Sequence, residues 1–120
     1  MPARIEIMAG GRDFAYDGQA ENVPVETLAV FFIANTASAI TGGARPVVPD
    51  DATQYPLVAQ CTALSDSVVF AAGEDPTAAA GATTPDGTNN RVMMGVPAGQ
   101  TFAMNVRPGD LISAVTMQTS

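Results

Sequence analysis

The sequence contains no histidine and no tryptophan, and it has a single cysteine among its 120 residues. Without histidine, a Ser-His-Asp triad, a Cys-His pair and a histidine-ligated metal site are all excluded. General acid–base chemistry would depend on carboxylates alone. The single cysteine, Cys61, cannot form an internal disulfide. Its place in the strand-like run 57–64 predicts a small buried side chain.

Positive charge is also scarce, because the sequence has no lysine and its five cations are all arginine. Binding to nucleic acid needs a basic surface, and so does binding to an anionic membrane, so neither partner is expected. Charged residues make up only 14% of the chain, and the formal net charge is −7. Small and uncharged polar residues must then cover much of the surface. Such a surface is easily desolvated, which suits a protein that works in contact with other proteins.

Long hydrophobic runs are absent as well. The longest, residues 28–34, has seven residues, whereas a helix needs about 20 to cross a bilayer. The N-terminus lacks the apolar stretch of a secretory signal peptide. We therefore expect the protein to be synthesised in a cytoplasm.

Apolar residues recur with a period of two between turn signals, which predicts an all-β fold. We expect a single domain over residues 1–120, a β-sandwich or barrel of about eight short antiparallel strands with long polar loops. The expected strands are residues 4–8, 13–16, 27–35, 57–64, 67–72, 91–96, 101–106 and 111–117. The first is expected to end in a turn at Gly10-Gly11, and the second in a turn at Asp17-Gly18.

Some segments carry more specific expectations. Residues 1–11 are expected to form an N-terminal arm or an edge strand. The strongly apolar residues 27–35 are expected to form a central strand that is buried on both faces. Gly, Pro and Asp mark residues 36–53 and 73–90 as long loops. Residues 107–110, Arg-Pro-Gly-Asp, place Pro and Gly at the two central positions of a type II turn.

No pattern in the sequence points to catalysis. Adjacent Asp50 and Asp51 fit a solvated loop better than a calcium site, which needs several converging oxygen ligands. The glycine pairs at 10–11 and 42–43 lack the spacing of phosphate-binding loops. Acidic residues between 13 and 26 could supply a carboxylate pair for glycoside hydrolysis, but the aromatic platforms that sugars usually meet are scarce. We expect no catalytic, cofactor-binding or metal-ligating residues, and no enzyme activity.

Interface residues are expected instead. Arginine is favoured at interfaces because its planar guanidinium pairs with carboxylates and stacks. The N-terminal strand alternates polar and apolar residues, so it could pair with the sheet edge of a neighbouring molecule. The residues predicted to contact a partner are Arg4, Ile5, Ile7, Arg45 and Arg107.

Residues 96–115 resemble the C-terminal hairpin of small virion proteins of tailed bacteriophages, of the capsid decoration (cement) type. The likeness is carried by a strand, the turn Pro108-Gly109-Asp110 and a short apolar strand that ends in Ser-Ala-Val. It implies a protein on the capsid surface of the virion that binds the major capsid protein, bridges neighbouring subunits and stabilises the head. It also implies a homo-oligomer, often a trimer, and no cofactor.

Two other functions fit the same sequence. A tail, neck or baseplate component of a phage would have a similar composition. A carbohydrate- or receptor-binding β-module is the second alternative, although the scarcity of aromatic residues argues against it.

Overall fold

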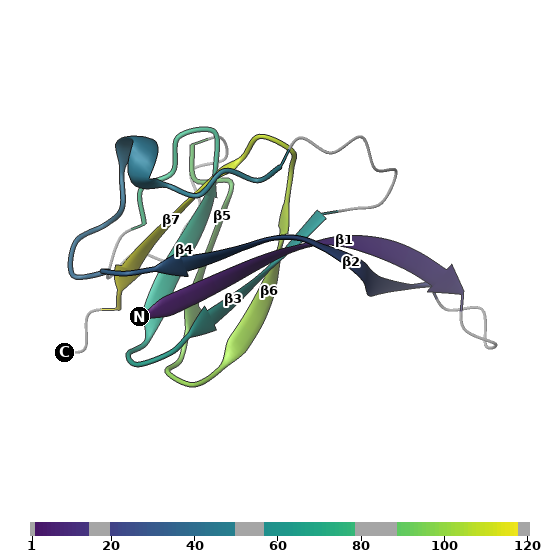
Figure 1. The fold of residues 1–120 in the computed structure, drawn as a ribbon, viewed down its shortest axis with the longest axis horizontal. Helices are drawn as coiled ribbons and strands as arrows, with labels where there is room; N and C mark the ends of the chain where they lie inside the picture. The colour runs from purple at the N-terminus through teal and green to yellow at the C-terminus, as the bar shows by residue number, and fades with distance from the viewer. Residues whose placement is uncertain (1, 15–19, 50–56, 79–88, 118–120) are drawn as a thin grey trace.

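The computed structural model describes residues 2–14, 20–49, 57–78 and 89–117. Two antiparallel sheets of four and three strands pack face to face (Figure 1), so the chain is an all-β sandwich and the predicted fold class is confirmed. The elements are β1 (Ala3–Phe14), β2 (Ala20–Ile33), the 3-10 helix η1 (Gly42–Ala44), β3 (Leu57–Ala63), β4 (Val68–Gly73), β5 (Val92–Val96), β6 (Thr101–Val106) and β7 (Leu111–Thr116).

The described residues hold seven strands rather than eight, because two of the expected strands are one. Strand β1 runs without interruption through Gly10 and Gly11, where the sequence predicted a turn. The register against β2 shifts between Ile7 and Met8 and again between Ala9 and Gly10. Glycine in a strand often marks such an irregularity. The expected turn at residues 17–18 lies outside the described residues.

Sheet A has the strand order β2-β1-β3-β6, and sheet B has the order β5-β4-β7. Strand β1 therefore lies inside sheet A, and the expectation of an N-terminal arm or edge strand is wrong for residues 3–9, which pair with β2 and β3. Strand β2 is the edge strand instead of a central one. The hairpin folds β2 onto one side of β1, and β3 then adds to the other side.

The core lies between the two sheets. Alternate residues of β1 and β3 point into it, and both Ile5 and Cys61 are fully buried. The largest fully buried side chain, Phe70, comes from β4 in the opposite sheet. Burying one large aliphatic or aromatic side chain contributes about 1.5–3 kcal/mol. The predicted burial of Cys61 is confirmed.

Sheet B is covered on its outer side as well. Val69, Ala71 and Val115 form a second apolar cluster with Ala78, against which Ala39, Met93 and Met117 pack. Met94 instead packs on the main core, so adjacent methionines of β5 face opposite sides, as expected for a strand. Coverage of both faces explains why every residue of β4 is buried.

Three connections carry the chain from one sheet to the other: β3 to β4, β5 to β6, and β6 to β7. The segment that resembles a phage hairpin is therefore not a hairpin, because β6 belongs to sheet A and β7 to sheet B. The predicted type II turn does join them. Gly109 has φ +82°, and the Asp110 N–H donates to the Arg107 carbonyl at 3.0 Å.

Candidate protein interface

Two of the five predicted interface residues are core residues. The side chains of Ile5 and Ile7 have no exposed surface and belong to the main core cluster. A partner could reach them only by opening the sandwich. The prediction is corrected by the position of β1, whose inward side chains meet sheet B.

Arg45 also has a role inside the molecule. Its Nη1 atom lies 2.7 Å from Asp75 Oδ1 and donates to the Pro76 carbonyl at 2.8 Å, while its Nε donates to the Gly42 carbonyl at 3.0 Å. Only 9% of its side chain is exposed. Arg45 therefore fastens the loop after η1 to the loop after β4, and it offers little surface to a partner.

The other two predicted residues remain accessible. Arg107 is exposed in the turn before β7. Arg4 lies on the outer side of β1 with about a third of its side chain exposed. Its guanidinium carbon lies 6.0 Å from the centre of the Phe32 ring, a cation–π geometry.

Arg4 belongs to a surface made by all four strands of sheet A. Directly opposed residues of neighbouring strands share a face, so the register assigns the members of each row. One row is Phe32, Arg4, Thr62 and Thr101, and the next is Val30, Glu6, Gln60 and Ala103. We call these eight residues the outer face of sheet A.

Arg4, Glu6, Thr62 and Thr101 of this face each make a polar contact with a neighbouring side chain. Glu6 lies 3.5 Å from Arg4 and accepts a hydrogen bond of 2.7 Å from the Thr27 hydroxyl. The hydroxyl oxygens of Thr62 and Thr101 lie 2.7 Å apart and are hydrogen-bonded. Paired groups lose less on leaving water than unpaired ones, so this face is suited to contact another protein surface.

The edge strands β7 and β2 differ in whether their outer backbone groups have hydrogen-bond partners. Residues 36–48, here called the strap, run along the outer edge of β7 and cover it. The backbone hydrogen bonds are Thr116 N–H to Thr36 C=O (2.7 Å), Ile40 N–H to Ala114 C=O (3.2 Å), Ile112 N–H to Pro46 C=O (3.0 Å) and Val48 N–H to Asp110 C=O (2.7 Å). Strand β7 is therefore closed to further pairing.

Strand β2 is open along its outer edge. Among the described residues, the backbone of 27–33 makes no hydrogen bond outside its ladder with β1. Its side chains Val30 and Phe32 are 41% and 55% exposed. An open, apolar edge strand is a ready site for strand addition.

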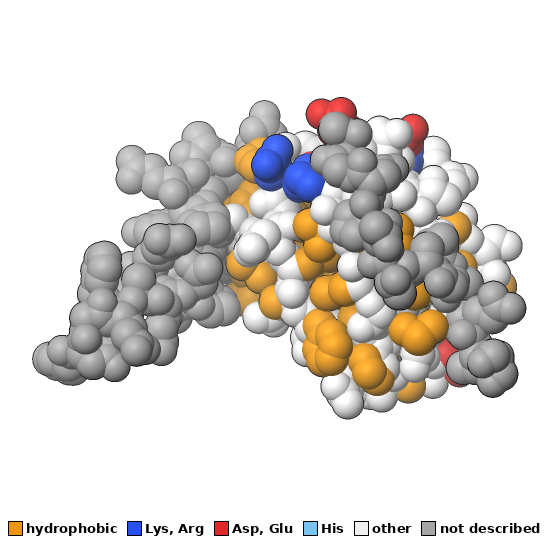
Figure 2. Space-filling view, turned by 180° about the vertical axis from the view of Figure 1, so that it is seen from behind, with side chains coloured by type: hydrophobic (Ala, Val, Ile, Leu, Met, Phe, Trp, Pro, Cys, Tyr) orange, Lys and Arg blue, Asp and Glu red, His pale blue; other side chains and the backbone are white. Residues whose placement is uncertain are grey.

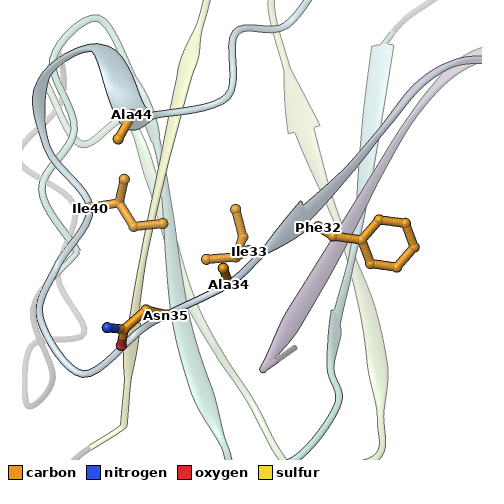
Figure 3. A pocket seen from close by; sticks show the side chains of 6 residues that line it. All are labelled: Phe32, Ile33, Ala34, Asn35, Ile40 and Ala44. Carbon is orange, nitrogen blue, oxygen red and sulfur yellow. The ribbon is translucent and has the colours of Figure 1, made fainter.

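A shallow hollow lies where β2 ends. It has a volume of about 260 Å³ and is lined by Phe32, Ile33, Ala34, Asn35, Ile40 and Ala44. Figure 3 shows Ile40 and Ala44 across the hollow from Ile33, with the Phe32 ring turned away from it. The lining carries no charge, and the volume is below the 300–1,000 Å³ usual for ligand pockets. The hollow suits an apolar side chain better than a small-molecule substrate.

The rear of the molecule has few charges too. Figure 2 shows hydrophobic side chains gathered on its lower part, with the Arg side chains near the upper rim.

Among the described residues, no three of His, Cys, Asp and Glu lie close enough together to hold a metal ion. The described residues also include no helix of the length and apolarity required to pass through a membrane.

Comparison with known proteins gives no relative: no family model, no curated protein and no solved structure matches this chain.

Sequence reasoning missed the exposure of Val30 and Phe32. An apolar run in an edge strand has the same composition as one in a central strand, and only the sheet order separates them. The available signal was weak: the run follows a turn dipeptide at 17–18 and could form a hairpin with the N-terminal strand.

Proposed function

We propose that the chain is a structural protein of a tailed-phage virion, a capsid decoration protein that binds the major capsid protein and bridges neighbouring subunits. The observation that carries the proposal is the reach of the β1–β2 hairpin. Strand β3 pairs with β1 only from Ala3 to Ala9, whereas β1 and β2 stay paired up to Phe14 and Ala20. The hairpin thus extends beyond the sandwich (Figure 1).

The extension has no further strand beside it among the described residues. Within them, residues 10–14 and 20–24 pair only with each other, and a two-stranded ribbon is at best marginally stable in water. A second surface that covers the ribbon would stabilise it. This is the behaviour expected of an arm that docks on a neighbouring subunit, and it also accounts for a longest dimension of 46 Å against 26 Å in the other two directions.

The body of the sandwich would supply the remaining contact. The outer face of sheet A spans four strands, and its charges are paired. Binding through both the face and the hairpin makes the second contact intramolecular, so that weak contacts add up to tight attachment. Repetition over the capsid lattice then holds adjacent capsid subunits together without covalent chemistry.

The test is a binding assay on expanded, undecorated capsids of the phage that encodes the chain. The full-length protein is titrated onto capsids, and bound copies are counted by mass and located by cryo-electron microscopy. Saturation at symmetric sites is expected, together with greater resistance of the capsids to heat. A full-length protein that ignores these capsids would contradict decoration, and tail assemblies would then be the next particles to test.

A shortened variant isolates the hairpin. Replacing residues 10–25 with Asn-Gly closes the ladder at the pair Ala9 and Glu26 with a two-residue turn. The pairing of β1 with β3 is left intact. We expect unchanged thermal stability of the sandwich and a loss of capsid binding of at least about tenfold. Binding equal to that of the full-length chain would show that the hairpin is not the arm.

A further inference from the structure

The open edge of β2 differs from every other sheet edge in this fold. Strands β5 and β6 are edges of five and six residues, and the strap covers β7. Strand β2 has 14 residues. Proteins usually protect long edges with charged residues, Pro or bulges. The first half of β2 has such protection, in Glu21, Pro24, Glu26 and a register shift at Leu28, whereas residues 29–33 contain no charge, no Pro and no register shift.

The exposed side chains on this edge are self-complementary. Val30 and Phe32 both point to the outer side of sheet A, since their partners Glu6 and Arg4 do. In an antiparallel pair of β2 strands centred on Phe31, Val30 of each copy lies opposite Phe32 of the other. The two largest exposed side chains of the edge would then cover each other.

We propose that a second copy of this chain pairs with β2 along this edge, antiparallel and about a two-fold axis at Phe31. The two four-stranded sheets become one continuous eight-stranded sheet. The inference goes beyond the proposed function and does not depend on capsid binding. It also specifies a two-fold pair, whereas a trimer would need a different, head-to-tail surface.

Charge selects this register over its neighbour. With the axis at Phe31, one row across the dimer is Arg4, Phe32, Val30 of the second copy and Glu6 of the second copy. Each row then has Arg4 of one copy at one end and Glu6 of the other copy at the other end. With the axis at Val30, Glu6 of one copy would share its row with Glu6 of the other. The charges lie about three strand spacings apart, so they influence register more than affinity.

The hollow beside β2 leaves room for the incoming strand. Ile40 and Ala44 of the strap stand back from Ile33 and Ala34 across it (Figure 3). In the proposed register, Ala29 of the second copy lies opposite Ile33, the last residue of β2 and part of the lining of the hollow. The second copy would therefore bury apolar surface that is exposed in the single chain.

The first test is the mass of the full-length protein in solution, measured by sedimentation over a range of concentrations. We expect a monomer–dimer equilibrium. Val30→Lys and Phe32→Lys each place a charge on the dimer seam, which should weaken dimerisation about 100-fold. Both side chains are exposed in the monomer, so circular dichroism should be unchanged. The matched control is Ala103→Lys, an exposed residue on the outer face of sheet A but on the far edge strand β6, which should leave the dimer intact.

The second test reads the register directly. Val30→Cys and Phe32→Cys chains are prepared separately, mixed and oxidised. Opposed residues bring Cβ atoms to about 5 Å, whereas diagonal ones lie farther apart. Cross-linking is therefore expected in the mixture and not in either chain alone. The native Cys61 is buried and should not react.

Several results would overturn the proposal. A wild-type chain that stays monomeric at the highest concentration that remains in solution would do so, and so would a stable trimer. A dimer that survives both Lys substitutions would place the contact elsewhere. Cross-linking of Val30→Cys chains with themselves alone would shift the axis to Val30.

Discussion

Arg91 and Asp110 form a two-pronged ion pair that joins the start of β5 to the start of β7. Arg91 Nη1 donates to Asp110 Oδ1 at 3.2 Å, and its Nη2 donates to Oδ2. The same carboxylate accepts the Arg107 N–H at 2.8 Å. Only 6% of the Asp110 side chain is exposed, so one buried carboxylate fixes both the turn and the segment that precedes β5.

We expect Asp110→Asn to lower the free energy of unfolding by about 3 kcal/mol, because breaking a buried pair leaves an uncompensated charge. Urea denaturation followed by circular dichroism measures the change. Asp75→Asn is the matched control: Asp75 also pairs with an arginine, at 2.7 Å, but 69% of its side chain is exposed. Arg45 would still donate to the Gly42 and Pro76 carbonyls, so loss of the exposed Asp75 carboxylate should cost under about 1 kcal/mol. Equal losses at the two sites would refute the role of burial.

Ser113 connects two loops beneath sheet B. Its hydroxyl accepts the Ala78 N–H at 2.9 Å and donates to the Ile40 carbonyl at 2.7 Å. Ser113→Ala would leave both backbone groups without this partner, at a loss of about 2–3 kcal/mol. The Ala78 amide should also exchange its hydrogen faster. Ser67→Ala removes a more exposed contact, to the Ala98 N–H, and should lose less than about 1 kcal/mol. A Ser113→Ala variant with an unchanged free energy of unfolding would show that Ser113 does not hold the two loops.

Stability should fall at alkaline pH because of Cys61. Burial raises the pKa of its thiol in the folded chain, whereas the unfolded thiol ionises near pH about 8.5. Above that pH the unfolded chain holds fewer protons, so unfolding becomes easier by up to about 1.4 kcal/mol per pH unit. Below it the contribution is constant. The free energy of unfolding is measured by urea denaturation from about pH 7.5 to about pH 9.5 for the wild type and for Cys61→Ala. The wild type should lose stability more steeply with pH than the variant. An equal pH dependence of the two proteins would argue against a contribution from Cys61.

Gly109 is required for its backbone conformation. Its φ is +82°, and a Cβ at this position would meet nothing within 4 Å. Gly109→Ala should therefore lose about 1–2 kcal/mol through backbone strain alone. Gly43 has equally open surroundings but no positive φ, so Gly43→Ala should be neutral or slightly stabilising. Melting temperatures of the two variants separate strain from crowding, and identical values would contradict the strain.

Local patterns predicted the parts of the fold that depend on neighbours in sequence. The alternation of β3 and the type II turn at Gly109 follow from side-chain period and turn chemistry. The sheet order did not follow, because it depends on which strands meet after long loops. That is why β1 was expected at an edge and β2 at the centre. Gly10 and Gly11 were misread for a related reason: glycine serves bulges as well as turns.

The candidate interface was predicted only in part. Arg4 could be recognised as an outward residue from the alternation around it. Ile5 and Ile7 were assigned to a surface because an N-terminal strand was taken to be peripheral. Arg45 looked like a free loop cation, but its partner Asp75 lies 30 residues away in sequence. No local signal brings these two together.

The strap also dictates when the fold can be completed. Thr36 and Thr116, whose hydroxyl oxygens lie 2.6 Å apart, are separated by 80 residues. During synthesis the β1–β2 hairpin can form early, but the backbone hydrogen bonds between the strap and β7 cannot form until β7 has left the ribosome. Contacts this distant in sequence slow folding and leave apolar surface open to aggregation meanwhile. Completion of the sandwich therefore awaits β7, and loss of β7 would release a segment that lies more than 60 residues earlier in the chain.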